Sequence, residues 1–585
     1  MRPPMTMFPR IPYAGLIRAF LILSAGNLPG ARADAGAAIP WITYEAEAMR
    51  TTGTVLGPQF APFHVETESS GQRCVKLAAA GEFVEFRASS EANAMVVRFN
   101  LPDPDRGGGT NSALELFING KSIRTLDLSS HFSLLYGNYP FSNDPGKGKP
   151  RNFYDELRVK NLTVAKGDVI RLQKSAADTP ACIVDLVDLE KVAPPLNQPA
   201  NALSVLYFGA AGNGEVDDTD ALIRCIAEAK KQHRICWVPA GDFKLTRDIL
   251  LPSAVTIQGA GMWHTTFVGN DKLYGHADRR VRFKLSGSDI HLADFSILGK
   301  LNYRNDDEPN DGVLGAGCAD STVSRIWIEH TKTGAWIYNG TNLVIEGCRF
   351  RDLLADGVNL CTGTNGTIVQ NCSTRGTGDD CFAIWPTVSD QGYVGQIPQP
   401  GNNIIRHCTG ELPFLANGGA LYGGAGNRIE DCVFSDITAG CGVLISTTFP
   451  TSDEQRKIDN NFSGMTVVNG CRLIRCGGYD HDWGWRGAFQ ICLDRRNISG
   501  LTISDVEIDD SFSDGIAVIA RDGAKGPGTL SNARLDNVRI SNIGLGAEGR
   551  HGLLIGKAAA GSVTLISSKI ADVQNNSAAF SVVKE

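Results

Sequence analysis

A short repeat in the second half of the chain constrains the fold most strongly. Beyond Val255, a small or acidic residue recurs just before a short apolar run, in "NDGVLG", "TGAWIY", "ADGVNL", "GDDCFAI", "GGALYG", "GCGVLI", "SDGIAVI" and "RHGLLI". We align these runs at Gly312, Ala335, Gly357, Asp380, Gly419, Gly442, Gly515 and Gly552, and four of the steps between them have nearly the same length, in the low twenties. A β-rich repeat of this length without helical periodicity predicts a solenoid of stacked strands, the parallel β-helix.

A second recurring position supports the same coils. Five cysteines follow strand-like runs in "VIEGCRF", "IVQNCST", "IIRHCTG", "RIEDCVF" and "VVNGCRL", at Cys348, Cys372, Cys408, Cys432 and Cys471. Because free cysteine packs as a small hydrophobic side chain, we expect an inward-facing ladder rather than metal or disulfide chemistry. The chain has 15 cysteines. Whether Cys225 pairs with Cys236, or Cys471 with Cys476, is left open.

The chain divides into two β-rich parts. Residues 41–192 alternate strand-like runs such as "EFVEFRA" and "AMVVRFNL" with Gly, Ser and Pro turns, which predicts a jelly-roll-like β-sandwich. The Pro-rich residues 193–202 predict a linker. Residues 203–585 then form the β-helix.

The N-terminal segment, residues 1–33, resembles an export signal. Arg2, Arg10 and Arg18 precede the apolar run "AFLILSAG" and an "ARA" cleavage site. A disordered basic tail is the alternative. No later segment approaches the roughly 18 apolar residues that span a bilayer, so we expect a secreted or periplasmic protein without a membrane partner. The net charge of −7 without a basic run argues against nucleic acid as a partner, and we expect a monomer.

Three aspartates on consecutive coils are the candidate catalytic residues. In our alignment Asp356 and Asp379 are equivalent, Asp380 follows directly, and Gly334 and Gly418 leave open space on the neighbouring coils. Neighbouring strands lie about 4.8 Å apart, so the three carboxylates should share one face. At least one should hold a proton near neutral pH, because three adjacent carboxylates cannot all ionise easily. Glycoside hydrolysis needs such an acid and base, with roughly 6.5–9.5 Å between them for inversion.

Stacked aspartates allow two other interpretations. They can cap turns by accepting hydrogen bonds from backbone N–H groups, or they can bind calcium. Asp514 stands alone before its strand, and there we favour capping. The cluster of three, with Trp385 closing its strand, favours catalysis.

Candidate substrate-binding residues lie downstream. Sugar rings bind against aromatic faces, and Trp385 lies just beyond the aspartate pair. The Gly-rich stretch "YDHDWGWRGAF" adds His481, Asp482, Trp483, Trp485 and Arg486. We interpret this loop as substrate-binding, with simple loop packing as the alternative. His330 and His407 are expected to be solvated.

The second part of the chain resembles a known group of enzymes. "FGAAGNGEVDDTDAL", "VPAGDF" and "VTIQGAG" are similar to the opening of the pectate-lyase-like right-handed β-helix. Within that superfamily, an Asp followed one coil later by Asp-Asp, as in "DGVNL" and "GTGDDCFAIW", is most similar to glycoside hydrolase family 87, the mycodextranases and α-1,3-glucanases. The resemblance implies an all-β fold, a right-handed parallel β-helix preceded by a β-sandwich.

The same resemblance implies an activity. It places the catalytic residues on Asp356, Asp379 and Asp380, with Asp379 as the acid and the other two holding and activating the water. It implies a secreted, endo-acting and inverting glycosidase that needs no cofactor for catalysis. Its partner would be a polysaccharide, an α-glucan such as α-1,3-glucan or nigeran.

Polygalacturonases share the superfamily but differ at the site. Their His-Gly and Arg-x-Lys are missing here, where "NGGALYG" stands, so a neutral glucan fits better than pectin. The alternatives are a dextranase- or polygalacturonase-related glycosidase, and a non-catalytic β-helix that binds polysaccharide.

The first part resembles carbohydrate-binding modules of families 6 and 35. "YEAEAM" is similar to their opening strand and "CIVDLVDLEKV" to their closing one. The resemblance implies a structural Ca²⁺ held by Glu45, Glu47 and Asp185. Plain sandwich edge strands are the alternative.

Overall fold

The computed structural model describes residues 35–103, 108–137, 145–175, 179–270, 281–308, 310–388, 400–521 and 526–585. The proposed export signal, residues 1–33, lies outside these ranges. The helices within them are all too short or too polar to cross a bilayer.

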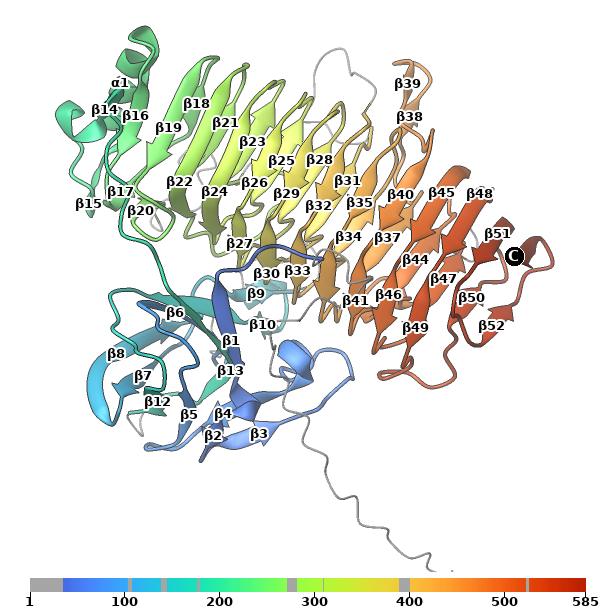
Figure 1. Ribbon diagram of the computed structural model, residues 1–585, viewed down its shortest axis with the longest axis horizontal. Helices are drawn as coiled ribbons and strands as arrows, with labels where there is room; N and C mark the ends of the chain where they lie inside the picture. The colour runs from blue at the N-terminus through green and yellow to red at the C-terminus, as the bar shows by residue number, and fades with distance from the viewer. Residues whose placement is uncertain are drawn as a thin grey trace, which may run out of the picture. The chain divides into compact units, whose positions relative to one another are not determined.

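The first part is a β-sandwich of two antiparallel sheets (Figure 1). One sheet holds β3 (Thr54–Leu56), β4 (Cys74–Leu77), β13 (Cys182–Glu190), β6 (Ala94–Asn100) and β11 (Asp155–Val159), with β1 (Trp41–Glu45) also paired to β13. The other holds β2 (Arg50–Thr51), β5 (Phe83–Arg87), β12 (Val169–Lys174), β7 (Asn111–Ile118) and β8 (Lys121–Ser129). Every second residue of β7 is buried, the alternation of a strand with one face on the core.

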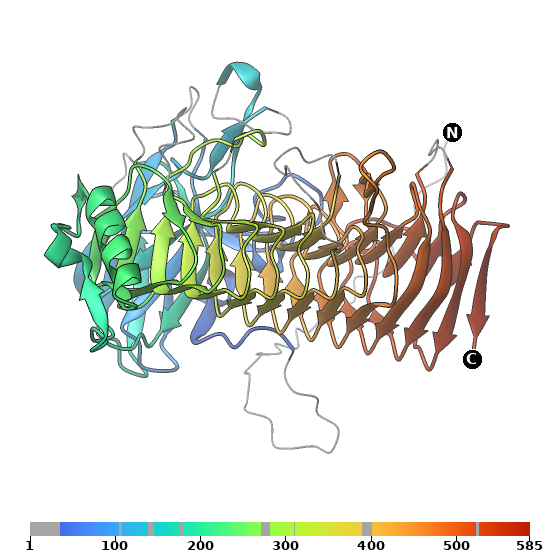
Figure 2. The same ribbon diagram turned by 90° about the horizontal axis from the view of Figure 1, so that it is seen from above.

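The second part is a parallel β-helix, as predicted. One 12-stranded sheet runs in the order β18 (Ile249–Leu251), β21 (Phe283–Leu285), β23 (Val313–Ala316), β25 (Ala335–Tyr338), β28 (Val358–Cys361), β31 (Phe382–Trp385), β34 (Gly419–Leu421), β37 (Val443–Ser446), β44 (Phe489–Cys492), β47 (Ile516–Ile519), β50 (Leu553–Ile555) and β52 (Val573–Asn575). A 24-stranded sheet from β14 (Ala202–Ser204) to β53 (Phe580–Lys584) completes the coils, which Figure 2 shows stacked along one axis.

The cysteine ladder lies inside these coils. Cys348, Cys372, Cys408, Cys432 and Cys471 are each at most 1% exposed, among Ile, Val and Phe side chains. All five are free thiols, which confirms the packing role predicted for them. Cys225 and Cys236 are also free thiols, with sulfur atoms 3.3 Å apart.

The strand register corrects our alignment at the aspartates. Val358 pairs with Phe382, so Asp356 shares its rung with Asp380 and not with Asp379. The coil from Val358 to Phe382 is one residue longer than the coil from Ala335 to Val358. Asp379 falls in the turn before the rung. A one-residue slip of this kind moves every side chain to the other face of a strand, so the register decides which groups meet.

The same correction applies to the neighbouring coils. The rung of Asp356 continues through Thr333 on one side and, beyond Asp380, through Asn417 on the other. Gly334 and Gly418, which we expected there, lie one position further along. The open space predicted beside the aspartates is therefore taken by the side chain of Asn417, which hydrogen-bonds to Asp380.

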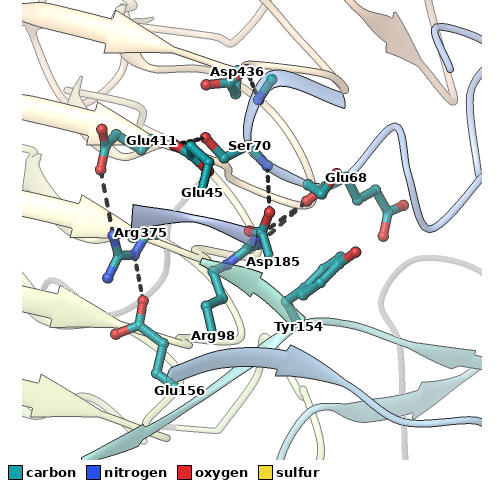
Figure 3. Close-up of polar contacts among 12 residues, drawn as sticks. Glu45, Glu68, Ser70, Arg98, Tyr154, Glu156, Asp185, Arg375, Glu411 and Asp436 are labelled. Carbon is teal, nitrogen blue, oxygen red and sulfur yellow. Dashed lines mark hydrogen bonds and ion pairs between the residues drawn. The ribbon is translucent and has the colours of Figure 1, made fainter. Parts of the chain in front are cut away.

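Buried ion pairs join the sandwich to the coils (Figure 3). Arg375, the last residue of β30 (Ser373–Arg375), binds Glu156 and also Asp188, the latter at 2.6 Å. Burial alone would raise the pKa of Glu156, but Arg375 and Arg351 lower it below its usual value. Because Arg375 begins the turn that ends in Asp379 and Asp380, the sandwich helps to fix that turn.

Candidate active site

The three aspartates converge at the start of two neighbouring strands. Asp356 precedes β28, and Asp379 and Asp380 precede β31. One carboxylate oxygen from each lies within 4.8 Å of the others. The predicted cluster is therefore present. The roughly 6.5–9.5 Å separation expected between the acid and base carboxyl groups of an inverting enzyme stays a prediction.

The two aspartates that share a rung are buried, and each favours its protonated form. Asp380 is 3% exposed; burial and then Asp379 raise its pKa to about 7, against the hydrogen bonds it accepts. Those bonds come from the Asn417 side-chain amide at 2.7 Å and the Tyr422 hydroxyl at 2.9 Å. Burial, followed by Asp379 and Asp380, raises the pKa of Asp356 well above its usual value. The cluster consequently holds a proton near neutral pH.

Asp379 differs in being accessible and paired with a cation. Its side chain is 27% exposed, and Arg304 Nη2 donates to its Oδ2 at 2.7 Å. The buried Arg304 also donates from Nη1 to the carbonyls of Gly378 at 2.8 Å and Leu354 at 3.2 Å. One guanidinium thus ties the turn before Asp379 to the turn before Asp356. Sequence reasoning missed Arg304, since it lies in an irregular segment without any repeating pattern.

Aromatic side chains continue the site along the outer face of the 12-stranded sheet. Phe382 and Ile384 face the core, so Trp385 on the same strand points outward. Its ring lies 5.8 Å from that of Trp336, and 5.5 Å from that of Phe449. Such faces suit the apolar side of a sugar ring. We name Trp336, Trp385 and Phe449 the aromatic patch. Trp336 was missed because its run, "TGAWIY", carries no acidic residue.

The predicted loop forms a hairpin of β42 (Tyr479–Asp480) and β43 (Gly484–Trp485). Trp483 packs in the same cluster as Trp385. The guanidinium groups of Arg486 and Arg521 lie 4.4 and 4.1 Å from its ring centre. The structure thus places Trp483 beside the aromatic patch. Arg486 lies against the Trp483 ring and is only 2% exposed.

The remaining predicted loop residues lie differently. Trp485 packs edge-on against Tyr479 at 5.6 Å and lies next to Gly546, away from the patch. His481 and Asp482 are both exposed, with side chains 3.6 Å apart. The substrate-binding role of these residues stays a prediction.

The proposed calcium ligands fit only in part. Glu45 Oε2 and Glu47 Oε2 are buried without a hydrogen-bond partner among the described residues. Burial raises the pKa of Glu45 well above its usual value and that of Glu47 to about 7, as expected of oxygens that could bind a cation. Asp185 instead binds Arg98 and accepts from Ser70 N at 3.0 Å (Figure 3). The structural Ca²⁺ stays a prediction, with Glu45 and Glu47 as its fitting donors.

The two histidines differ from each other. His407 has a side chain 43% exposed, in keeping with a solvated residue. His330, also expected to be solvated, is only 6% exposed and lies 2.9 Å from Asp155 of the sandwich. The expectation for His330 was wrong, because the sandwich covers it.

Known proteins match almost the whole described chain. Residues 38–192 match the family alpha-1,3-glucanase catalytic domain D1, and residues 215–584 match domain D2. The chain is similar to the solved catalytic domain of Agl-KA, with 26% identity over 96% of this chain and 100% of that one, and a TM-score of 0.83. It is also similar to the catalytic unit of a thermostable GH87 alpha-1,3-glucanase from Streptomyces thermodiastaticus, with 28% identity over 94% and 96% of the two chains and a TM-score of 0.79.

Two further similarities complete the comparison. A GH87 alpha-1,3-glucanase catalytic domain in complex with nigerose is 26% identical over 94% of this chain and 98% of that one, with a TM-score of 0.78. The pre-neck appendage protein of Bacillus phage B103 is 24% identical over 222 residues, which are 37% of this chain and 23% of that relative. The chain therefore spans less than a quarter of the curated relative's length.

These matches confirm the fold class and the predicted family. The sandwich is matched as the first domain of a catalytic unit, and its likeness to carbohydrate-binding modules stays a prediction. The match to the second domain alone spans more than half of the chain. The chain belongs to glycoside hydrolase family 87, the α-1,3-glucanases.

Proposed function

We propose that this protein hydrolyses α-1,3-glucosidic bonds inside a polysaccharide, α-1,3-glucan or nigeran, with inversion at the anomeric carbon. The observation that carries the proposal is the carboxylate cluster, whose three oxygens lie within 4.8 Å of one another beside an aromatic patch on the same sheet. A cluster that keeps a proton at neutral pH can supply both an acid and a base.

Related structures support the assignment of the three aspartates. GH87 alpha-1,3-glucanase catalytic domains with single Asp-to-Ala substitutions were solved with nigerose or tetrasaccharides. Two of the three substituted positions are adjacent, and the third precedes them by about one coil of a β-helix. Asp356, Asp379 and Asp380 have the same spacing in this chain, residue for residue.

The exposure of the three carboxyls suggests how they divide the reaction. Asp379, the accessible one, takes up the proton that the three carboxyls share and gives it to the leaving glycosidic oxygen, and Arg304 at 2.7 Å then stabilises the carboxylate that remains. With the shared proton on Asp379, Asp356 and Asp380 are ionised; they lie deeper, where they hold a water and take its proton as it attacks the anomeric carbon, which restores the shared proton. Retaining enzymes hold their two carboxyl groups roughly 5–5.5 Å apart, so retention through a glycosyl-enzyme is the competing outcome for a cluster this compact.

The charges of the site favour a neutral sugar. Arg304, the cation beside the cluster, already binds Asp379, Asp306 and two backbone carbonyls. Asn417 stands in the "NGGALYG" coil, where polygalacturonases have their His-Gly, and its amide is used by Asp380. A uronate carboxylate would thus meet three acidic groups beside a guanidinium that is already engaged, at a considerable electrostatic cost.

A panel of polysaccharides tests the proposal. Purified protein should release reducing ends from α-1,3-glucan and nigeran but not from dextran or polygalacturonate. Asp379→Asn should abolish release while the variant still sediments with insoluble α-1,3-glucan. Binding without release by the unmodified protein would instead favour the non-catalytic alternative, and release from dextran would favour the related glycosidase. We also propose that the protein is exported and monomeric. Secretion assays test the export, and light scattering tests the monomeric state.

A further inference from the structure

A second cluster of ligand-type side chains lies where the sandwich meets the coils. Asp155 begins β11 of the sandwich, His330 follows β24 (Thr322–Glu329), and Asp352 follows β27 (Arg349–Arg351). One donor atom from each lies within 4.8 Å of the others. All three residues are at most 6% exposed. The cluster thus connects the sandwich to two consecutive coils.

Two polar atoms of this cluster are left unsatisfied. Asp352 Oδ1 and His330 Nδ1 are buried without a hydrogen-bond partner among the described residues. Buried polar groups are nearly always paired, and an unpaired buried carboxylate is especially costly. Neither atom has a partner among the described residues, and the carboxylate oxygen of Asp352 is one that a cation could satisfy.

The surroundings make Asp352 a strong candidate for a cation. It is only 6% exposed, and the negative charges of Asp155 and Glu156 act on it. His330 is already oriented: its Nε2 lies 2.9 Å from Asp155 Oδ1, and its ring packs 5.0 Å from that of Phe132. A fixed imidazole between two carboxylates is a common arrangement around metal ions.

We propose that Asp155, His330 and Asp352 bind one divalent transition-metal ion of the zinc type. One imidazole nitrogen with two carboxylate oxygens suits zinc, whereas calcium is bound by oxygen alone. Zinc–ligand distances are about 2.0–2.2 Å, so three atoms within 4.8 Å of one another would draw together slightly around a central ion. The ion would displace the proton now between His330 and Asp155, as metal binding generally does.

Such an ion would fasten the sandwich to the coil that carries the active site. Asp352 stands one turn before Asp356, and the intervening Leu353, Leu354 and Ala355 are buried. The three proposed zinc ligands share no residue with the three catalytic aspartates.

Zinc content and thermal stability test the proposal. The full-length protein is stripped with a chelator, incubated with zinc sulfate, desalted, and analysed by mass spectrometry and calorimetry. We expect one zinc per chain and a higher Tm than the stripped protein, with both effects lost in Asp352→Asn and in His330→Gln. The controls Asp379→Asn, Glu47→Gln and Asp514→Asn should keep the zinc. No bound zinc, or zinc retained by both cluster variants, would overturn the proposal.

X-ray absorption of the zinc-loaded native protein covers the case in which a variant fails to fold. One imidazole among oxygen ligands is the expected environment. A shell of oxygen alone would place the ion at the catalytic or the Glu45–Glu47 carboxylates and would also overturn the proposal.

Discussion

Asp356 and Asp380 are neighbours just before two adjacent strands, because the pairing of Val358 with Phe382 puts both on one rung of the β-helix. The arrangement stacks two buried carboxyls with the more accessible Asp379 beside them. It is the source of the raised pKa values and hence of a proton that the site can give to a leaving group.

The first prediction concerns the dependence of activity on pH. The pKa of Asp380 is raised to about 7, so the cluster loses its stored proton as the pH rises through that value. We expect kcat/KM on soluble nigero-oligosaccharides to fall above about pH 7. The pKa of such a carboxyl is near 4 in the unfolded chain and about 7 in the folded protein. The free energy of unfolding should therefore fall as the pH rises from about 4 to about 7. A rate constant that does not change across neutral pH would contradict this account.

The second prediction concerns Tyr422, whose hydroxyl donates to Asp380 Oδ2 at 2.9 Å. This bond favours the ionised carboxylate, so Tyr422→Phe should raise the pKa of Asp380 further. The falling limb of the pH profile should move to higher pH. Tyr44→Phe, which removes a hydroxyl bonded to Ser89 in the sandwich, is the matched control and should leave the limb in place. A shift of the falling limb to lower pH in Tyr422→Phe would contradict this prediction.

The third prediction concerns Arg304. Its loss removes the hydrogen bonds to the carbonyls of Leu354 and Gly378, which connect the turns before Asp356 and Asp379. It also removes the positive charge beside Asp379. We expect Arg304→Gln to lower kcat by about 100-fold with little change in KM, since misplacement by about 1 Å can cost that much. Arg304→Lys should recover part of the loss. Arg539→Gln, which breaks an exposed ion pair with Glu507, should be neutral; an equally active Arg304→Gln would refute the positioning role.

The fourth prediction separates the aromatic residues. Trp385→Ala and Trp336→Ala remove neighbouring rings of the aromatic patch and should raise KM about 10-fold each, equivalent to about 1.4 kcal/mol. Trp485→Ala should change KM less, because that ring packs against Tyr479 and Gly546 instead. Initial rates on nigero-oligosaccharides of increasing length measure both effects. A larger effect at Trp485 would relocate the sugar-binding surface to the hairpin.

The fifth prediction concerns the interface between the β-sandwich and the coils of the β-helix. Arg375→Met removes the guanidinium bound to the buried Asp188 and leaves Glu156 with Arg351 at 3.5 Å. Breaking a buried pair in this way costs about 3–5 kcal/mol, so the free energy of unfolding and the Tm should fall clearly. Arg50→Met, which removes an exposed arginine from Glu85 while Arg171 stays bound to that carboxylate, should cost no more than about 1 kcal/mol. Equal Tm values for the two variants would show that the stability of this interface does not depend on Arg375.

The sequence allowed the coils and the cysteine ladder to be predicted because both repeat along the chain. The register at Asp380 was missed by one residue, since turns between strands vary in length without an apolar pattern to reveal it. Arg304 and Trp336 carry no periodic signal, and their roles depend on side chains brought from distant coils. His330 was misjudged because only the folded chain shows that Asp155 of the sandwich covers it.

The anomeric form of the first product tests the central claim most directly. Proton NMR during hydrolysis of a soluble nigero-oligosaccharide should show the β-anomer of the new reducing end first, and Asp379→Asn should yield no product. An α-anomer appearing first, or unchanged hydrolysis by Asp379→Asn, would contradict the division of work among the three aspartates.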